Sequence, residues 1–330
     1  MRPLPAATVS FGHADVLDPA GPGAREIASL GWLLFLVAGA VFVAVVIFLI
    51  VALRRARQNE DRLPDAPLAV PQRGRRVVIW AGAIIPALIL TVVFGYTVRA
   101  LVALAGPPER DEAITVQVIG HQFWWEMRYL TPGNPDVAAV TANEMLLPVG
   151  ERVRVELTSD DVIHSFWSPS LHGKMDTLPG QVNRFWIQAD RVGLYQGPCA
   201  EFCGAQHANM YVRLRAVPLA QFEAWLGIQR QSAAETRSES AVRGREIFVQ
   251  RGCANCHTIR GVSARSNLGP DLTHLASRET LGAGMMPNNR GNLSGWILNA
   301  QGVKRGSLMP PFTLDGQELD DLLNYMESLE

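Results

Sequence analysis

Residues 197–217 read GPCAEFCGAQHANMYVRLRAV and join a cluster of potential metal ligands to an alternating segment. Cys199, Cys203, His207 and Met210 follow one another at spacings of four, four and three. Thiolate, imidazole and thioether together suit copper better than a hard cation, because sulfur ligands select soft metals and imidazole binds copper readily. Apolar and polar residues then alternate through MYVRLRAV, which predicts a half-buried β-strand. The sequence therefore predicts a metal-binding loop carried by a β-sheet.

A histidine upstream completes the candidate ligand set. His164 lies in DDVIHSFW, shortly after RVRVELT, in which Val153, Val155 and Leu157 share one face of a predicted strand. With two histidines present, the two cysteine thiolates could bridge two copper ions, whereas mononuclear blue-copper sites use one cysteine. Two alternatives stay open. One is a zinc site of two cysteines and two histidines, which would leave Met210 idle, and the other is a disulfide between the cysteines.

The region around these ligands has the pattern of an all-β domain. Short alternating segments are separated by proline and glycine at 132–135, 148–150, 179–180 and 197–198. Many short strands of this kind predict a sandwich or a barrel, and a helix is expected after Pro218. The predicted strands are AITVQVI (113–119), RVRVELT (152–158), NRFWIQA (183–189) and MYVRLRAV (210–217).

A second cysteine pair belongs to a different motif. Cys253, Cys256 and His257 form a C-x-x-C-H sequence, in which two thiols bind haem vinyl groups and the imidazole becomes an axial ligand. Met309 in SLMPPF is the best candidate for the sixth ligand, because the prolines after it stiffen the loop that must present the thioether. The competing candidates are Met285 and Met286, in AGMMPNN.

Helical periodicity surrounds this motif. Residues 231–240, QSAAETRSES, have no large apolar residue and predict a flexible linker. Apolar residues recur at helical spacing over 319–326, and Asp315 and Glu318 suit a capping box before them. An all-α domain is therefore expected over 242–330.

Two uncharged stretches near the N-terminus are long enough to cross a membrane. Residues 31–53 and 77–98, as helices with about 1.5 Å rise per residue, can each cross a hydrocarbon core of roughly 30 Å. Pro86 is tolerable in the second stretch because neighbouring groups can satisfy the carbonyl that it frees. A cleaved signal peptide is the alternative for the first stretch, but its apolar run exceeds the about 7 to 15 residues of a signal core.

The charges that flank the two spans predict their orientation. The connecting segment 54–76 carries seven arginines, whereas residues 1–30 carry only Arg2 and Arg25. The positive-inside rule therefore places the connecting loop in the cytoplasm and both termini outside. The expected parts are an outer segment (1–30), a transmembrane hairpin (31–106), a metal-binding β-domain (107–230), a linker (231–241) and a haem-binding domain (242–330).

Composition supports cofactor chemistry and gives no sign of a polyanionic partner. With 30 basic and 31 acidic residues the net charge is -1, which offers no electrostatic reason to expect nucleic acid. The four cysteines form two close pairs, unlike the dispersed framework of disulfide-rich secreted domains.

DDVIHSFWSPSLHGKMDTLPGQVNRF, followed by GPCAEFCGAQHANM, resembles the CuA domain of cytochrome c oxidase subunit II, over about residues 27–225. The resemblance implies a two-helix transmembrane hairpin followed by an all-β, Greek-key, cupredoxin-like barrel that holds a dinuclear copper site. It further implies that the carboxylate of Glu201 contributes to a magnesium site shared with subunit I. The implied copper ligands are His164, Cys199, Cys203, His207, Met210 and the backbone carbonyl of Glu201.

The segment GHQFWWEMRY resembles the aromatic-rich segment through which electrons reach the copper in that family. The family usually has tryptophan where this chain has Phe123, which departs from the pattern. Trp124 and Trp125 are alternatively ordinary core or interface aromatics.

The C-terminal segment resembles class I cytochromes c, whose distal methionine lies in a loop before the last helix, where Met309 stands. NLGPDLTHL resembles the loop at the haem edge of that family, which implies that Pro270 lies near the proximal histidine. His274 is expected to be structural.

Subunit II fused to a cytochrome c domain resembles the arrangement in bacterial caa(3)-type haem-copper oxidases. The resemblance implies an electron-input subunit of a proton-translocating cytochrome c oxidase in the bacterial plasma membrane, with subunit I and subunit III as partners. Cytochrome c or another upstream donor would reduce the haem, and electrons would pass through CuA to subunit I, where oxygen becomes water. Tethering both centres on one chain would make electron delivery intramolecular.

Three other functions share parts of this pattern. A membrane-anchored copper chaperone also uses Cys-x-x-x-Cys and a distant histidine, but it would not need His207, Met210 or a haem domain. A quinol oxidase subunit would lack the copper ligands. A CuA-bearing nitric oxide reductase subunit would have the same electron-input module and differ in its partner subunit.

Overall fold

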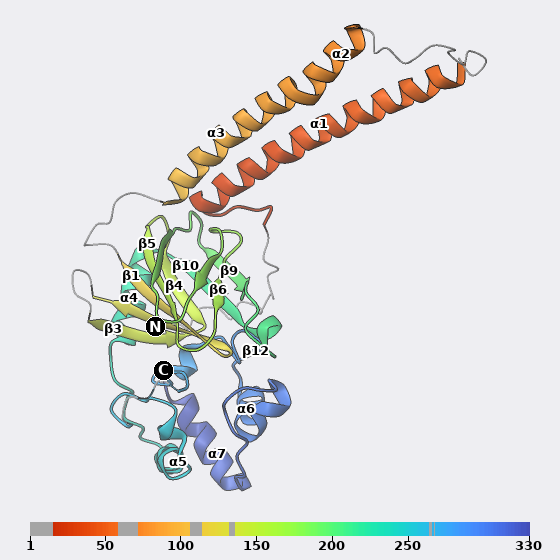
Figure 1. Ribbon diagram of the computed structural model, residues 1–330. Helices are drawn as coiled ribbons and strands as arrows, with labels where there is room; N and C mark the ends of the chain where they lie inside the picture. The colour runs from red at the N-terminus through yellow and green to blue at the C-terminus, as the bar shows by residue number, and fades with distance from the viewer. Residues whose placement is uncertain (1–15, 59–71, 106–113, 132–135, 264–265, 267) are drawn as a thin grey trace. The chain divides into compact units, whose positions relative to one another are not determined.

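The computed structural model describes residues 16–58, 72–105, 114–131, 136–263, 266 and 268–330 (Figure 1). Contacts divide the chain into two compact units. One unit comprises residues 25–105, and the other joins residues 1–24 to residues 106–330. The β-domain and the haem-binding domain expected from the sequence therefore belong to one compact unit.

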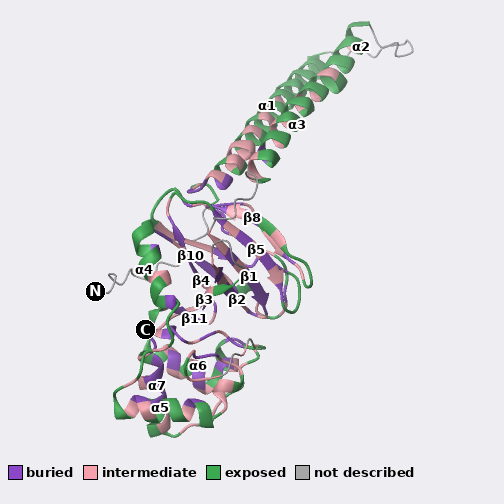
Figure 2. Ribbon diagram, turned by 90° about the vertical axis from the view of Figure 1, so that its left-hand side faces the viewer, coloured by how far each residue is buried: buried purple, intermediate pink, exposed green. Residues whose placement is uncertain are grey.

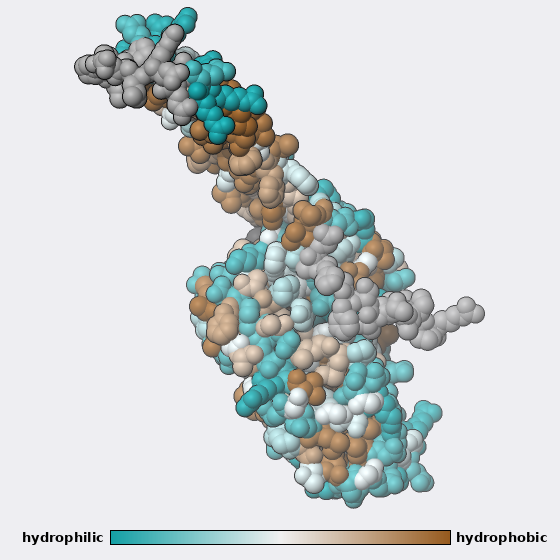
Figure 3. All heavy atoms as spheres, turned by 90° about the vertical axis from the view of Figure 1, so that its right-hand side faces the viewer, coloured by the Kyte–Doolittle hydropathy of each residue, from teal (hydrophilic) through white to brown (hydrophobic). Residues whose placement is uncertain are grey.

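The unit 25–105 is a helical hairpin. Helix α1 (Pro22–Gln58) and the pair α2 (Gln72–Ile79) and α3 (Ile85–Ala105) are long and apolar enough to cross a membrane. Their side chains are mostly exposed (Figure 2), and apolar atoms cover much of the hairpin surface (Figure 3). Both helices extend beyond the predicted spans, and much of the expected cytoplasmic loop lies outside the described residues. Such surfaces require an apolar environment.

A π-helical turn, Trp80–Ile84, separates α2 from α3 directly before Pro86. Proline has no N–H, so the usual i to i−4 bond is lost there. The residue before it, Ile85, donates its N–H to Trp80 O, five residues earlier, instead of to the i−4 carbonyl. The helix thus accommodates the proline locally by widening one turn.

The β-domain is a sandwich of two main sheets. A five-stranded sheet has the order β3-β2-β1-β5-β8, and a three-stranded sheet has the order β4-β10-β9. Side chains of β5 alternate between buried and half-buried, as the sequence predicted for RVRVELT. The strands of the larger sheet are β1 (Thr115–His121), β2 (Trp124–Leu130), β3 (Val137–Ala142), β5 (Val153–Ser159) and β8 (Asn183–Ile187). The others are β4 (Glu144–Pro148), β9 (Gly193–Pro198), β10 (Tyr211–Val217) and a small pair, β6 (His164–Phe166) with β7 (Met175–Thr177).

One apolar core fills the space between the sheets. Trp125, Tyr129 and Phe166 are among its largest fully buried side chains. Helix α4 (Leu219–Gln229) follows Pro218 as expected and closes one side, where Trp225 packs edge-on against Tyr129 with centroids 5.1 Å apart. The all-β, cupredoxin-like fold predicted from the sequence is confirmed.

The C-terminal domain is helical, as predicted. Its main helices are α5 (Glu239–Gln250), α6 (Arg290–Val303) and α7 (Gly316–Glu327), with a short β-pair, β11 (Thr280–Leu281) and β12 (Met286–Pro287). Asp315 and Glu318 form the expected capping box at the start of α7. The segment before α5 was predicted to be a flexible linker, yet it contacts this domain. Ala233 N–H donates to Arg260 O, and Gln231 O lies 3.1 Å from His274 Nε2.

Candidate functional site

The structure brings together the side chains predicted to bind copper. Cys199 Sγ lies 3.9 Å from Cys203 Sγ and 4.0 Å from His164 Nδ1. Cys203 Sγ lies 3.8 Å from His207 Nδ1 and 3.9 Å from Met210 Sδ. The ligand atoms of His164, Cys199 and Cys203 all lie within 4.8 Å of one another. These five side chains form a compact set of soft donors.

The sandwich carries these ligands on its strand ends and one loop. His164 begins β6, while Cys199 directly follows β9 and Met210 directly precedes β10. Cys199 N–H donates to Met210 O at 2.8 Å, which closes the base of the loop. Ala200 N–H donates to Ser165 O at 2.9 Å, which ties the loop to β6. Backbone bonds therefore preorganise ligands that are far apart in the sequence.

Asp161 orients His164. His164 Nε2 lies 2.8 Å from Asp161 Oδ1, and an ionised carboxylate only accepts, so Nε2 carries the proton and Nδ1 faces Cys199. Burial lowers the pKa of His164, but hydrogen bonds with Asp161 and Cys199 outweigh burial and raise it. A carboxylate behind a histidine in this way is the usual support of a metal-binding imidazole.

The two thiols are electrostatically coupled. The hydrogen bond from Cys203 lowers the pKa of Cys199 to about 3, against burial, which raises it. The pKa of Cys203 is raised, because its thiol hydrogen-bonds to Cys199 and is buried. Their 3.9 Å separation is well beyond the roughly 2.05 Å of a disulfide, and both cysteines are free. One thiolate is therefore ready to bind metal, and metal binding would displace the second proton.

Glu201 presents its backbone to this cluster. Cys199 Sγ lies 3.3 Å from the carbonyl oxygen of Glu201, which puts that carbonyl among the donor atoms. The residue itself is exposed. Met210 is fully buried beside Cys203, so its thioether is part of the cluster rather than idle.

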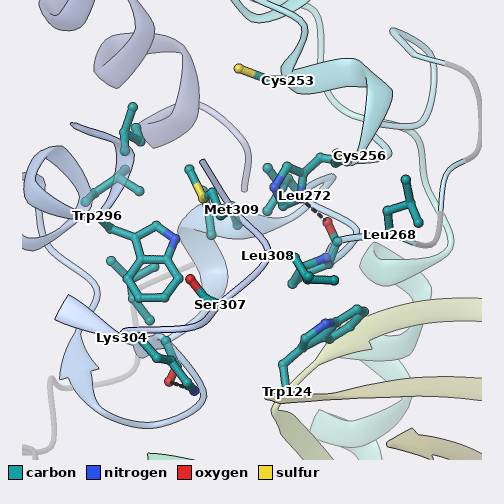
Figure 4. Close-up of a pocket in the computed structure, with 18 of the residues that line it drawn as sticks. Trp124, Cys253, Cys256, Leu268, Leu272, Trp296, Lys304, Ser307, Leu308 and Met309 are labelled. Carbon is teal, nitrogen blue, oxygen red and sulfur yellow. Dashed lines mark hydrogen bonds between the residues drawn. The ribbon is translucent and has the colours of Figure 1, made fainter. Parts of the chain in front are cut away.

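A second site surrounds a cavity of about 580 Å³ that is lined by the helical domain and by residues 122–124 of the β-domain (Figure 4). Cys253, Cys256, His257 and Met309 all line it, together with apolar side chains that include Trp296. The volume lies within the range typical of cofactor sites. Two thiols, an imidazole and a thioether around a largely apolar cavity fit a covalently bound haem.

His257 is held as a neutral ligand. Its Nδ1 lies 2.8 Å from Pro270 O, and because a carbonyl only accepts, Nδ1 carries the proton and Nε2 remains as the ligand atom. Burial lowers the pKa of His257, which favours the neutral ring. A Cβ on Gly269 would come within 2.7 Å of the imidazole, so only glycine fits there.

The three candidate methionines differ in position. Met309 lines the cavity, and Gln301 Nε2 donates to its carbonyl at 2.9 Å. Met286 belongs to β12, where it pairs with Leu281, and neither Met286 nor Met285 lines the cavity. The structure therefore favours Met309 as the candidate sixth ligand.

The aromatic segment lies between the two sites. Trp124 lines the haem-type cavity and stacks on His121, with ring centroids 4.2 Å apart. Trp125 is fully buried in the core and meets His164 edge-on at 5.7 Å. Phe123 is buried and also lines the cavity.

The sequence alone did not identify three residues that support these sites. Asp161 orients His164, and its position three residues upstream was the one available signal. Gln122 lines the cavity and donates through Nε2 to Cys203 O at 2.6 Å. Lys304 is buried between the two domains. His274 is structural, as expected, because its ring nitrogens face Glu330 O and Gln231 O at 2.6 and 3.1 Å.

Two family models match this chain. The model described as cytochrome c oxidase subunit II, periplasmic domain, matches residues 130–217. The model described as cytochrome c matches residues 241–330. The two matched regions contain the two sets of candidate ligands. The aromatic segment lies just before the first matched region.

Curated relatives match over nearly the whole chain. Cytochrome c oxidase subunit 2 of Alkalihalophilus pseudofirmus is 32% identical over 95% of this chain and 90% of its own length. The protein of the same name from Bacillus subtilis is 28% identical over 95% of this chain and 91% of its own length. Among solved structures, the periplasmic domain of subunit II from Bradyrhizobium japonicum is 30% identical, covering 37% of this chain and 96% of that domain, with a TM-score of 0.34. The chain belongs to the cytochrome c oxidase subunit II family and carries a C-terminal cytochrome c domain.

Proposed function

We propose that this chain takes electrons from cytochrome c or another upstream donor at a haem c and passes them through its own dinuclear CuA site to subunit I. Family membership makes the chain a subunit of a haem-copper oxidase, with CuA copper implied by its subunit II domain and haem by its cytochrome c domain. The observation that best supports this electron path is the position of Gln122. This residue lines the haem-type cavity and hydrogen-bonds to the Cys203 carbonyl at 2.6 Å, so it contacts both sites.

The copper ligands proposed are the five side chains of the cluster and one carbonyl. Their mixture of thiolate, imidazole and thioether supports copper over a hard cation. Two buried thiols 3.9 Å apart are suitably placed to bridge two ions. Bound copper would supply one-electron redox chemistry, while the chain holds the ligands rigid and excludes water. The proposed ligands are His164, Cys199, Cys203, His207, Met210 and the carbonyl of Glu201.

For the haem, we propose that Cys253 and Cys256 would hold it through thioether bonds and that His257 and Met309 would ligate its iron. A methionine ligand would raise the reduction potential of a c-type haem, which suits an electron carrier. The Pro270 carbonyl fixes the histidine ring, and the apolar lining of the cavity limits water.

The two apolar helices and the periplasmic domain imply a membrane protein with an extracellular domain. We propose a multi-pass protein of the bacterial plasma membrane, with both redox domains on the outer side, in contact with subunits I and III and membrane lipid. The carboxylate of the exposed Glu201 is proposed to share a magnesium ion with subunit I. The proposed terminal electron acceptor is oxygen, and nitric oxide reduction is the alternative, which would require a different partner subunit.

Cofactor content and electron paramagnetic resonance of the purified full-length chain test this function. We expect two coppers and one haem per chain, and a mixed-valence signal shared by both coppers. His164→Ala should alter that signal, because it removes a ligand. His172→Gln is the matched control, since His172 is a buried histidine of the same domain that packs against Phe185 and Trp186. A single labile copper with intact haem would favour the copper-chaperone alternative and contradict the proposal.

A further inference from the structure

Lys304 is a buried cation at the contact between the two redox domains. It follows directly after α6, and only 2% of its surface is exposed. Its Nζ donates to three backbone carbonyls, of Phe123, Asn209 and Gly282, each at 2.8 Å. The first two carbonyls belong to the β-domain and the third to the haem-binding domain. One ammonium group therefore ties the two domains together.

The hydrogen bonds of this ammonium are complete, and burial lowers its pKa to about 7, against the electrostatic attraction of Cys203. Three donors meet three acceptors, which satisfies a lysine in full. In the described part of the chain no carboxylate lies within ion-pair distance of Lys304. A buried cation is costly even when hydrogen-bonded, and an apolar side chain of similar size is often as stable in such a place. Stability alone is therefore a poor explanation for this lysine, whereas a fixed geometry of three carbonyls is a good one.

The carbonyls that Lys304 binds lie beside both candidate sites. Phe123 immediately precedes Trp124, and both line the haem-type cavity, as does Lys304 itself. Asn209 immediately precedes Met210, the thioether beside Cys203. In the sequence, Lys304 lies five residues before Met309. Figure 4 shows Lys304, Met309 and Trp124 around the same cavity. A shift of this lysine would disturb the haem side and the copper side together.

A second group of polar contacts joins the domains at the start of β4. The half-buried carboxylate of Glu144 accepts from Thr280 N–H at 2.8 Å and from the Thr280 hydroxyl at 2.6 Å. Glu279 in turn pairs with Arg213 at 3.0 Å and with Arg215. Because this second group can hold the domains together by itself, loss of Lys304 should loosen their orientation without separating them.

We propose that Lys304 is a positioning residue that fixes the haem-binding domain against the loops of the copper-binding domain, at the separation that electron transfer between them requires. The inference rests on the proposed function, since it concerns the path between the same two sites. Electron tunnelling falls steeply with distance, so a small loss of order at this contact affects the transfer rate more than it affects either site.

Three variants of the full-length, cofactor-loaded chain test the role. Lys304→Met removes all three hydrogen bonds and keeps an unbranched side chain of similar size, and Lys304→Gln keeps an amide that can donate. Arg305→Met is the matched control, because it removes one positive charge from the next, exposed residue. Two readouts are needed: the rate of haem-to-copper electron transfer after rapid haem reduction, and the magnetic dipolar coupling between oxidised haem and copper, which reports their separation.

We expect Lys304→Met to slow haem-to-copper transfer measurably, because the contact loses all three hydrogen bonds that fix it and tunnelling falls steeply with distance. The distribution of dipolar couplings should broaden in Lys304→Met. Both the rate and the coupling should be intermediate in Lys304→Gln and should equal the wild-type values in Arg305→Met. The optical spectra of both sites should stay unchanged, which a general folding defect would not allow.

Wild-type transfer and unchanged coupling in Lys304→Met would overturn the inference. If Lys304→Met fails to load its cofactors, Lys304→Gln decides in its place, and wild-type values there would overturn it equally. Failure of the proposed function would look different, because the wild-type chain itself would then show no haem-to-copper transfer. In that case the dipolar coupling still decides whether Lys304 positions the two domains.

Discussion

The pair Asp161 and His164 shows how one hydrogen bond can prepare a metal ligand. Asp161→Asn replaces a carboxylate that accepts from His164 Nε2 with an amide that can also donate, so the ring loses its fixed tautomer. Loss of such a support typically weakens metal affinity about 10- to 100-fold. Competition with a copper chelator should show this loss. Asp160→Asn is the control, since that side chain is 55% exposed and lies near His121. Equal copper affinities in the two variants would contradict the role of Asp161.

Met309 makes a second prediction at the level of one side chain. Met309→Leu removes the thioether that lines the haem-type cavity, so the haem should lose its sixth ligand, with a lower reduction potential and a changed optical spectrum. Met286→Leu should leave both unchanged, because Met286 lies in β12 away from the cavity lining. Potentiometric titration of both variants measures the difference. The reverse pattern would identify Met286 as the ligand.

Single residues also show what the sequence could and could not predict. The four candidate ligands of the loop 199–210 could be predicted from the sequence, because residues of these types at this spacing are typical of a metal site. His164 could be predicted as their partner, since it stands at a strand end. Asp161, Gln122 and Lys304 are common residue types with no local motif. Their roles arise only when folding brings positions such as 122 and 203, or 123 and 304, into contact.

At the level of elements, helices α5 and α7 pack with almost no space between them. A Cβ on Gly244 would lie 2.0 Å from Asp321 O and 2.7 Å from the Cβ of Tyr325. Gly244→Ala should therefore destabilise the haem domain by about 1–3 kcal/mol, the usual cost of overpacking. Gly295→Ala in α6 meets no atom within 4 Å and should gain up to about 1 kcal/mol from helix propensity. Thermal unfolding of the two variants, followed by haem absorbance, separates these outcomes, and equal melting temperatures would refute the close contact.

The same helix pair predicts a dependence on acid. Hydrogen bonds from Arg243 and Ser240 hold the pKa of Asp321 well below its usual range. A carboxyl whose pKa is lowered by folding contributes stability above its unfolded pKa of about 3.9, and this stability is lost as the pH falls toward the folded pKa. Asp321→Asn should thus lower the melting temperature at pH 7 and flatten its decline below about pH 4. Asp320→Asn, at a position 57% exposed, is the control. An unchanged pH profile in Asp321→Asn would contradict this account.

The elements were predictable to different degrees. Alternation in RVRVELT predicted strand β5, and helical spacing before the C-terminus predicted helix α7. The buried face of each could also be predicted, because local periodicity determines which side chains share a face. The π-helical turn before Pro86 and the contacts of residues 231–233 were not predictable. The first depends on how one helix accommodates a missing N–H, and the second depends on the surface that the second domain presents to a polar segment.

At the level of the whole molecule, two redox domains share one compact unit rather than swinging on a free linker. Their contact includes polar bonds to backbone groups, such as those of Lys304 and Glu144, and side-chain ion pairs of Glu279. The net charge of -1 could not predict this contact surface, because the charges there act in specific pairs and do not create a net potential. The domain order was predictable from two cysteine motifs, whereas the docking of the domains required the fold.

The measurement that tests the central claim most directly is time-resolved reduction of the full-length, cofactor-loaded chain. The haem is reduced by a light-driven pulse, and the absorbance of haem and copper is followed at several protein concentrations. The account predicts that the haem is reoxidised at the rate at which copper is reduced, and that this rate does not depend on concentration, because donor and acceptor lie in one compact unit. A rate proportional to concentration, or a haem that stays reduced while the copper remains oxidised, would contradict it.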